Sequence, residues 1–310
     1  MFLCGISYYL PEKILKNDFF KDLSGVSDEW IIERTGIKER RRAGADENTH
    51  SMGIAAVSSL KESFDLSDVD LIVGATYTPY DTIVTLAHAV QHFIQVPDVP
   101  ALSITSACSS FINASEIVEG YFAMGKAQKA LVITSEHNSA YSNDHEPKSG
   151  PLWGDGAAAV LYSKNQLAGG LKVVSIKSAG AATAGKATEA VTLRMHGGLS
   201  MPYGKDVFLN ACTKMAQVTA EILEENGFSL DDLNYVAPHQ ANFRITKKVL
   251  SNLGVGLDKA LSNIQYLGNT GCAGAVIALA EKWEEIKKGE IVVMPVFGGG
   301  YSYGAMLLKK

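Results

Sequence analysis

The stretch Ala101–Met124, ALSITSACSSFINASEIVEGYFAM, contains the transition that decides the fold. Its first five residues are an apolar, β-branched run of the kind found in buried strands, and the pattern from Phe111 onward is that of an amphipathic helix. Small residues fill the connection, which reads Thr105-Ser106-Ala107-Cys108-Ser109-Ser110. The stretch therefore predicts a strand followed directly by a helix, with Cys108 where the helix begins.

The same alternation of strand and helix extends in both directions from this stretch. In the first half, strands are expected at Phe2–Ile6, Val69–Ala75, Ala101–Thr105, Ala130–Ser135 and Ala157–Tyr162, and helices at His50–Glu62, Ile83–Ile94 and Phe111–Met124. In the second half, strands are expected at Leu171–Ile176, Leu233–Ala237, Ala260–Ile264, Ile291–Val296 and Ala305–Leu308, and helices at Asp206–Asn226, Asn242–Leu253 and Ala273–Lys288. Such alternation predicts parallel sheets with helices on both faces.

The two halves also match in their landmarks. The strand near Val73 precedes Cys108 at almost the same distance as Val236 precedes Cys272. A repeat this long indicates a duplicated domain rather than a solenoid. We expect an N-terminal half, residues 1–166, that carries the candidate nucleophile, and a C-terminal half, residues 167–310, that carries His239 and Asn269. Two joined βαβαβαβ halves predict an α/β fold of five layers, αβαβα, with Ser109–Met124 and Ala273–Lys288 in the central layer.

Composition excludes several classes of protein. The chain has 310 residues, of which 46% are hydrophobic and 20% charged, as in ordinary globular proteins. Its net charge of -5 argues against a nucleic-acid partner. No apolar run approaches the roughly 18 residues that span a bilayer, and the N-terminus lacks the basic start of a signal peptide. We therefore expect a cytoplasmic protein without a membrane partner, and its four widely spaced cysteines predict neither disulfides nor a zinc site.

Three polar residues follow expected strands and are candidates for catalysis. A thiol at a helix N-terminus, such as Cys108, meets unpaired N–H groups and the positive end of the helix dipole, which predicts a lowered pKa and a reactive thiolate. His239, after Pro238, and Asn269, after Gly268, could each donate an N–H to a carbonyl oxygen that gains charge. A packed cysteine, an ordinary loop histidine and a plain turn are the alternatives that the local sequence leaves open.

The position of these residues in the expected fold strengthens the case for a site. In open parallel sheets the chemistry lies beyond the carboxyl ends of the strands, so the three loops should lie on the same side of the molecule. The run Gly298–Gly300 permits close backbone approach and could direct a backbone N–H at an oxyanion. His88 and His92 have the spacing of a helical metal pair, but no third ligand is apparent, and no metal site is expected.

Six spaced blocks of sequence resemble the β-ketoacyl-acyl-carrier-protein synthase III family, in the same order and over nearly the whole chain. They are Ser27–Ile37, Ala107-Cys108, Gly154–Ala157, Pro238–Asn242 with Arg244-Ile245, Gly268–Thr270, and Phe297–Gly300 with Gly304-Ala305. The resemblance implies a thiolase-like fold and an acyltransferase that condenses an acyl group with a malonyl thioester. It also implies a homodimer, with the segment after Thr76–Tyr80 reaching the pocket of the partner.

The resemblance implies roles for individual residues. Cys108 would be acylated by a thioester, and His239 and Asn269 would assist decarboxylation of the malonyl unit. The backbone N–H groups of Cys108 and Gly299 would form the oxyanion hole. Four residues would bind coenzyme A or the carrier protein: Trp30, Arg34, Arg244 and Lys247. The substrates would be coenzyme A or phosphopantetheine thioesters, with no other cofactor.

Three segments depart from the family pattern and leave the acyl primer open. They are Cys108–Phe111, where Cys-Ala-Gly-Phe is usual, Gly271–Gly274, where Ser-Ala-Ala is usual, and Asp81–Leu86, where Phe-Pro-Ser is usual. A role in fatty acid synthesis and one in specialised polyketide or fatty-acid-derived biosynthesis are both open. So is acyl transfer to an oxygen, nitrogen or non-malonyl carbon nucleophile. A thiolase, a Cys/His hydrolase and a non-catalytic dimer partner fit the residues less well.

Overall fold

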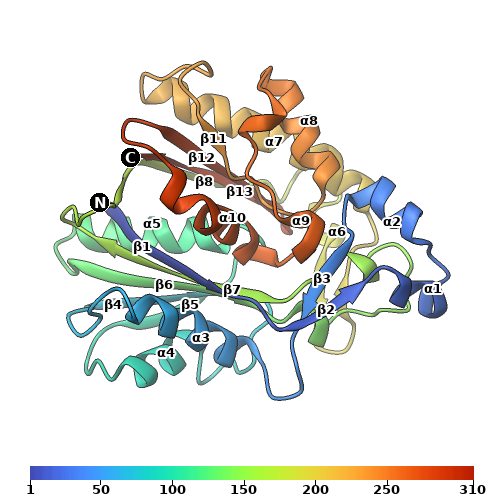
Figure 1. The fold of residues 1–310 in the computed structure, drawn as a ribbon, viewed down its shortest axis with the longest axis horizontal. Coiled ribbons are helices and arrows are strands. Elements are labelled where there is room, and N and C mark those ends of the chain that lie inside the picture. Colours follow the sequence, from blue (N-terminus) through green and yellow to red (C-terminus); the bar gives the residue numbers. More distant parts are fainter.

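A computed structural model describes all 310 residues of the chain. Nine strands form one hydrogen-bonded sheet in the order β11-β12-β13-β8-β1-β7-β6-β4-β5. Their bounds are β1 Phe2–Tyr9, β4 Leu71–Ala75, β5 Ala101–Ile104, β6 Lys129–Glu136, β7 Gly156–Ser163, β8 Leu171–Gly180, β11 Tyr235–Val236, β12 Ile291–Gly298 and β13 Ser302–Lys309. Only two residue pairs join β1 to β8, Phe2 with Lys172 and Leu3 with Leu171. The sheet folds over at this narrow junction, so its two halves lie in separate layers (Figure 1).

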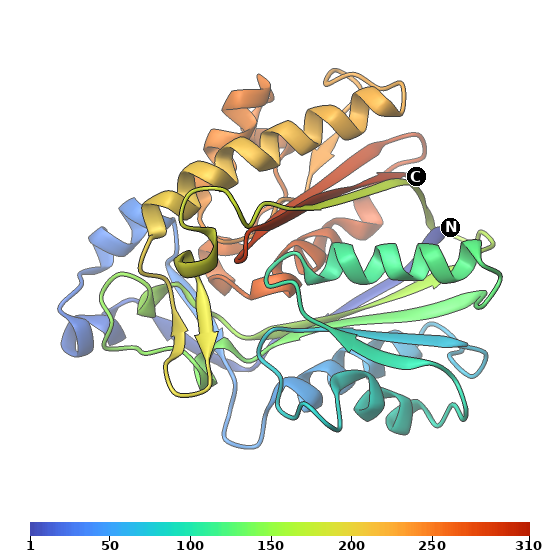
Figure 2. The same cartoon turned by 180° about the vertical axis from the view of Figure 1, so that it is seen from behind.

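Helices cover both outer faces and fill the space between the layers. α3 (Thr49–Lys61) and α4 (Leu86–Ile94) pack on the outer face of one half, and α7 (Gly204–Glu225) and α8 (Phe243–Leu253) cover the other. α5 (Ser110–Ala123) and α10 (Gly274–Lys282) lie between them (Figures 1 and 2). The predicted αβαβα arrangement, including its shared central layer, is confirmed.

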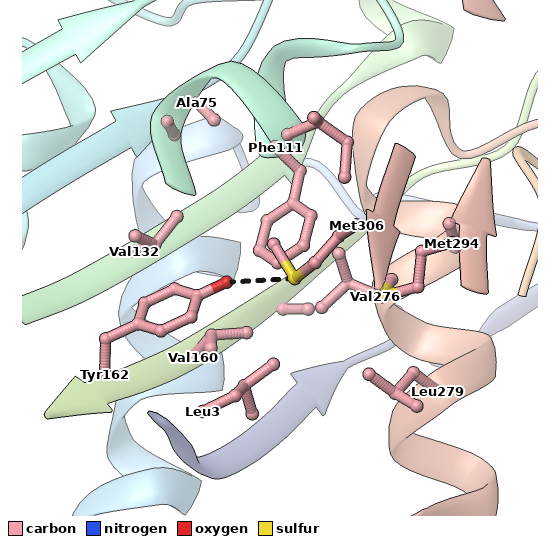
Figure 3. Close-up of a cluster of buried hydrophobic side chains, with 14 of the residues drawn as sticks. Leu3, Ala75, Phe111, Val132, Val160, Tyr162, Val276, Leu279, Met294 and Met306 are labelled. Carbon is pink, nitrogen blue, oxygen red and sulfur yellow. Dashed lines mark hydrogen bonds between the residues drawn. The ribbon is translucent and has the colours of Figure 1, made fainter. Parts of the chain in front are cut away.

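The largest hydrophobic cluster joins the two halves through this central layer. It unites 33 buried residues, among them Leu3 of β1, Phe111 of α5, Val276 of α10 and Met306 of β13. Figure 3 shows these side chains meeting between the two halves of the sheet, with the Tyr162 hydroxyl 3.9 Å from the Met306 sulfur. Truncating one buried side chain of this size to alanine typically lowers the free energy of unfolding by about 2–5 kcal/mol. The packing in this layer therefore holds the two halves together as one unit.

The expectation of parallel sheets is wrong for most of the strand pairs. β4 is parallel to β5 and β6, and β11 is parallel to β12, but β7 is antiparallel to both β1 and β6, and β13 to both β8 and β12. The reason lies in the connections: β13 follows β12 through a tight glycine turn, and β7 follows β6 through a loop with only 3₁₀ turns. Antiparallel neighbours need no crossover helix, and the apolar runs alone do not reveal direction.

The expected strand Ala260–Ile264 is also wrong. A single parallel bridge between Val236 and Ala260 occupies the position that β5 has beside β4. The chain then turns into helix α9 (Ile264–Leu267), and the Gln240 side-chain oxygen accepts hydrogen bonds from the backbone N–H groups of Asn263 and Ile264. The side chain of Gln240 thus accepts the hydrogen bonds that a neighbouring strand would otherwise accept from the backbone of Asn263 and Ile264. The central helix of this half is shorter than expected, because α10 ends at Lys282 and is followed by a 3₁₀ turn, η5 (Trp283–Glu285).

The shorter elements gather mostly at one end of the molecule, to the right in Figure 1. They are β2 (Lys13–Lys16), α1 (Asp18–Ser24), α2 (Asp28–Thr35), β3 (Glu39–Arg42), η1 (Asn138–Ala140), η2 (Gly150–Leu152), α6 (Ala187–Ala190), β9 (Thr192–Arg194), β10 (Gly198–Ser200), η3 (Leu257–Lys259) and η4 (Gly271–Ala273). The proposed boundary between the halves falls in the connection from β7 to β8, residues 164–170, and stays a prediction. None of the helices combines the length and apolar character needed to cross a membrane.

Candidate active site

Cys108 lies in a strained turn between β5 and α5. The preceding residue, Ala107, has φ of 50°, a left-handed conformation that is uncommon for a residue with a side chain. Such a conformation costs about 1–3 kcal/mol and persists only where the surroundings impose it. Here the Ser110 hydroxyl accepts from the Ser106 N–H at 2.7 Å and donates to the Ala107 carbonyl at 2.6 Å. The turn therefore holds the nucleophile candidate rigidly at the start of α5.

The glycine run after β12 packs directly against this turn. A Cβ atom at Gly298 would lie 2.8 Å from the backbone nitrogen of Cys108 and 3.1 Å from that of Ser109, so only glycine fits there. A Cβ at the next residue, Gly299, would lie 3.7 Å from the Cβ of Ala107. The structure thus brings together the two backbone segments expected to form the oxyanion hole.

The prediction of a lowered pKa for Cys108 is wrong. Burial, reinforced by the nearby carboxyl group of Glu136, raises the pKa of the thiol to about 12, although interaction with the Tyr77 hydroxyl lowers it somewhat. Loss of hydration disfavours the thiolate more strongly than the helix terminus favours it. The resting Cys108 side chain is therefore a neutral thiol.

His239 reaches the same end of the sheet by continuing the path of β11. Its backbone N–H donates to the carbonyl of Pro295 in β12 at 2.9 Å, and Gly298 ends that same strand. The loops of His239 and Cys108 therefore meet at the carboxyl end of β12. The side chain is buried, and burial lowers its pKa to about 4. The imidazole is neutral at physiological pH, so one ring nitrogen carries a proton that it can donate.

Asn269 is fixed by its backbone and by one side of its amide. Its backbone N–H donates to Leu152 at 2.7 Å, and its carbonyl accepts from the N–H of Gly154 at 3.0 Å. The side-chain oxygen accepts from the N–H of Gly271 at 3.0 Å. This bond orients the amide and leaves its NH₂ group as the donor, which is the group required to stabilise a developing oxyanion.

Gly154→Ala is expected to destabilise the fold by about 1–3 kcal/mol, the usual cost of overpacking. A Cβ there would lie 1.9 Å from the carbonyl oxygen of Leu267, and the loop that carries Asn269 would have to move. Chemical denaturation measures the stability. Gly120→Ala, where a Cβ meets nothing within 4 Å, is the matched control. A Gly154→Ala protein as stable as the control would contradict this packing.

A cavity of about 1000 Å³ opens beside α2 and α8. Trp30, Arg34 and Arg244 line it, and the Arg34 guanidinium lies 4.7 Å from the centre of the Trp30 ring. The side chain of Asn242 joins the two helices by donating to the Arg34 carbonyl at 2.9 Å. Lys247 is not brought into this group: it lies farther along α8, outside the lining, with its Nζ 4.8 Å from the centre of the Phe243 ring.

Three lysines that sequence reasoning missed also line this cavity: Lys148, Lys186 and Lys205. With Arg34 and Arg244 they make five basic side chains, against a single acidic one in the lining. Lys148 and Lys186 lie in irregular segments and Lys205 lies in the first turn of α7, and no periodic pattern in the sequence pointed to them. The cavity is therefore suited to a ligand that carries several negative charges.

Comparisons with known proteins fit this geometry. Two family models match, the C-terminal part of 3-oxoacyl-[acyl-carrier-protein] synthase III over residues 223–310 and the synthase III model itself over residues 102–180. A β-ketoacyl-[acyl-carrier-protein] synthase III of Aquifex aeolicus is 34% identical over 99% of this chain and 98% of its own. The chain belongs to the synthase III family.

Other members of the synthase III family are similar to this chain in sequence and in structure. A protein of the same name from Clostridium perfringens is also 34% identical, over 99% of this chain and 98% of its own. Among solved structures, the synthase III of Aquifex aeolicus superimposes with a TM-score of 0.93, at 33% identity over 100% of this chain and 99% of that one. That of Pseudomonas aeruginosa gives 0.91, at 28% identity over 99% and 97%. The thiolase-like fold is therefore confirmed.

Within this synthase III fold, Glu136 is a buried carboxyl that sequence reasoning missed. It ends β6 and accepts hydrogen bonds from the hydroxyl of Thr76 at 3.1 Å, the hydroxyl of Thr78 at 2.5 Å and the thiol of Cys272 at 2.9 Å. Burial raises its pKa to about 7, against the opposing effect of these donors. The only feature of the sequence that could have indicated Glu136 is its place at the end of an expected strand, next to a polar segment. The Cys272 thiol is buried and its pKa is raised well above the usual value, which argues against the second, basic cysteine that a thiolase would require.

Proposed function

We propose that this protein is a condensing acyltransferase of the β-ketoacyl-acyl-carrier-protein synthase III kind. Cys108 takes an acyl group from a thioester and transfers it to the carbanion of a decarboxylated malonyl thioester. The observation that carries this proposal is the meeting of the Cys108 turn, the His239 loop and the Gly298 strand end at β12. The pathway is either fatty acid synthesis or a specialised polyketide or fatty-acid-derived route.

In the first half-reaction, the sulfur of Cys108 attacks the thioester carbonyl. A carbon–sulfur bond forms on the enzyme, the bond to the leaving thiol breaks, and the proton of Cys108 ends on that thiol. The backbone N–H groups of Cys108 and Gly299 donate to the oxyanion of the intermediate. The neutral resting thiol, whose pKa is raised to about 12, loses its proton during attack rather than beforehand.

In the second half-reaction, a malonyl thioester loses carbon dioxide, and its electron pair becomes an enolate. His239 and Asn269 donate N–H groups to the enolate oxygen, which suits their neutral imidazole and oriented amide. The carbanion then attacks the acyl carbon, the carbon–sulfur bond to Cys108 breaks, and the released thiolate takes up a proton from water to restore the neutral thiol. Two donors in a dry pocket suffice, because the reaction forms a carbanion by decarboxylation and needs no strong base. The covalent intermediate predicts ping-pong kinetics.

The cavity beside α2 and α8 would hold the coenzyme A or phosphopantetheine part of each substrate, with Trp30 and Arg34 at the nucleotide end. Its five basic side chains support an anionic ligand, either the phosphates of coenzyme A or an acidic carrier protein. We assign Lys247 only to the exposed surface around the opening. No cofactor beyond these thioesters is required by the chemistry.

Arg244→Glu should raise the KM for the carrier-protein substrate by roughly tenfold at low salt, with little change in kcat. Reversing one charge at a basic opening weakens association with an anionic partner, and salt screens the effect. Steady-state kinetics at two ionic strengths measure it. Lys38→Glu, an exposed charge reversal outside the cavity lining, is the matched control. Unchanged carrier-protein kinetics in the Arg244 variant would remove this residue from the docking surface.

We also propose a homodimer that works in the cytoplasm. After β4, the segment that contains Tyr80, Ile83 and Val84 exposes these side chains to 65%, 83% and 54%. An apolar run this exposed favours burial against a second copy of the chain. The four cysteines are all free thiols, which supports a reducing compartment.

Intact-protein mass spectrometry tests the proposed function. The protein is mixed with a panel of acyl-coenzyme A thioesters and then with malonyl-carrier protein. We expect an acyl adduct that malonyl-carrier protein discharges with release of carbon dioxide. An adduct that only an oxygen, nitrogen or non-malonyl carbon nucleophile discharges would favour the acyltransferase alternative. No adduct with any thioester would overturn both.

A further inference from the structure

Two serine hydroxyls join the segments that would form the oxyanion hole. Ser109 directly follows the nucleophile and is buried, and Ser302 begins β13 directly after the turn that carries Gly299. The two hydroxyl oxygens lie 2.6 Å apart, which is a hydrogen-bond distance between hydroxyl groups. The proposed reaction gives neither side chain a role.

Both hydroxyls also bond to a single carbonyl group. The backbone oxygen of Ser106 accepts from the hydroxyl of Ser109 at 2.7 Å and from that of Ser302 at 2.9 Å. Each hydroxyl has one proton, so the three contacts are satisfied together when Ser302 shares its proton between this carbonyl and the Ser109 oxygen. The hydroxyl of Ser302 lies a further 3.4 Å from the carbonyl oxygen of Gly299. One side chain thus contacts both the turn of the nucleophile and the turn of Gly299.

No backbone hydrogen bond joins these two turns. β12 and β13 pair with each other as far as Gly298 and Ser302, and β13 pairs on its other side with β8. The backbone N–H groups of Ser109 and Ser110 bond within their own turn. Gly298 permits close approach to the nucleophile turn but has no side chain that could define the distance. The pair of hydroxyls is therefore the polar contact that fixes one turn against the other.

We propose that Ser109 and Ser302 are positioning residues that set the spacing between the two N–H donors of the oxyanion hole. The inference rests on the proposed function, in which the backbone N–H groups of Cys108 and Gly299 are these donors. The two donors come from different halves of the molecule, so local backbone structure cannot fix their separation. A displacement of about 1 Å in a catalytic group can lower a rate by about 10²-fold.

Two reactions of the Cys108 sulfur separate oxyanion stabilisation from access to the thiol. 4-Nitrophenyl acetate acetylates the sulfur through a tetrahedral oxyanion and releases 4-nitrophenolate, whereas iodoacetamide alkylates it, releases iodide and forms no oxyanion. In both reactions the thiol proton goes to water. Peptide mapping by mass spectrometry confines both rates to Cys108, since Cys4, Cys212 and Cys272 are buried. The ratio of the acetylation rate to the alkylation rate reports the oxyanion hole.

Ser302→Ala should lower this ratio by about tenfold, and Ser302→Thr, which keeps the hydroxyl, should restore it. In single-turnover acylation by acetyl-coenzyme A, the maximal rate should fall while the concentration that gives half of it stays the same. Binding is spared because neither serine lines the cavity beside α2 and α8. Ser178→Ala is the matched control, since it removes a hydroxyl of the neighbouring strand β8 that donates to Glu116.

Ser109→Ala should lower the ratio less, by about threefold, because Ser302 keeps its bond to the Ser106 carbonyl. This variant carries the alanine that is usual in the synthase III family, so it tests the inference even if Ser302→Ala does not fold. The double variant should lose no more than Ser302→Ala alone, because the two hydroxyls act through one contact.

An unchanged ratio in either single variant would overturn the inference. Equal slowing of acetylation and alkylation would overturn it too, since that result reports a general disturbance of the thiol. So would a failure of the ester to acetylate the unaltered protein. If no coenzyme A thioester acylates the unaltered protein, the proposed function is rejected, and the ratio measured with 4-nitrophenyl acetate still decides whether the serines position the two donors.

Discussion

Cys108→Ala is expected to abolish the acyl adduct on the protein and to lower condensation by about 10⁴-fold or more, as removal of a catalytic nucleophile typically does. The alanine methyl group occupies the place of the sulfur without forming a covalent bond. The turn itself should persist, because Ser110 and Gly298 hold its backbone and neither contact involves the thiol. Loss of activity would then report loss of the nucleophile, not loss of the fold.

Intact-mass measurement of the adduct and a condensation assay check this result together. Cys4→Ala is the matched control, since Cys4 is also buried but lies where β1 begins, near Asn165, at the end of the sheet away from the site. That variant should keep both adduct and product. Product formation at the original rate by Cys108→Ala would reject the covalent mechanism. A persistent adduct would transfer the role to another thiol, with Cys272 the first to examine.

Two of the helices, α3 and α5, were predictable to within one residue at each end. α5 begins one residue before its predicted start and ends one residue before its predicted end, and α3 is likewise displaced by one residue at each end. In α3, Asn48 accepts from the backbone N–H groups of His50 and Ser51, a capping interaction contained in four consecutive residues. Such signals are local, so sequence alone conveys them.

The arrangement of the strands was less predictable, because it depends on contacts between distant segments. The apolar runs of β6 and β7 give no indication that these strands are antiparallel. No strand forms at residues 260–264, where the side chain of Gln240 bonds to the backbone of Asn263 and Ile264. Gln240 reaches this segment only in the folded protein. The five layers were nevertheless predictable, because the alternation of elements and the repeat between the halves do not require strand direction.

The residues of the candidate site were also predictable in part, whereas their protonation states were not. Cys108, His239 and Asn269 could be proposed because each follows an expected strand within a recognisable motif. Their electrostatic states could not, because these depend on burial: the thiol of Cys108 has a raised pKa where the helix terminus alone predicted a lowered one. Glu136 and Ser302 were missed for a related reason, since their importance comes from what they touch.

His239→Ala is expected to slow decarboxylation by about 10²–10³-fold, the usual effect of losing one donor to an oxyanion. The acyl adduct on Cys108 should still form, because the first half-reaction as proposed uses backbone N–H donors and not His239. Release of carbon dioxide from malonyl-carrier protein measures the loss, and His196→Ala, an exposed histidine in the turn between β9 and β10, is the matched control. Equal loss of acylation and decarboxylation would contradict this division of roles.

The same histidine also predicts a dependence of stability on pH. Burial lowers the folded-state pKa of His239 to about 4, whereas an unfolded histidine has a pKa near 6.5. Above pH 6.5 both states are neutral and the group has no effect. As pH falls from about 6.5 to 4, the unfolded chain takes up a proton that the folded protein refuses, so stability is lost, by about 2 kcal/mol at pH 5.

Denaturant titrations at pH 8 and pH 5 should therefore show a smaller difference in unfolding free energy for His239→Ala than for the unaltered protein. Comparing the two proteins at each pH removes the contributions of other titrating groups, such as Glu136. If the difference is the same in both, the folded-state pKa of His239 is not lowered, and its ring becomes charged below about pH 6.5. If the difference between pH 8 and pH 5 is about 2 kcal/mol smaller in His239→Ala, the imidazole of the unaltered folded protein stays neutral down to pH 5. Its charge then does not change as pH rises through 6.5, so the decarboxylation step should not lose its His239 donor there.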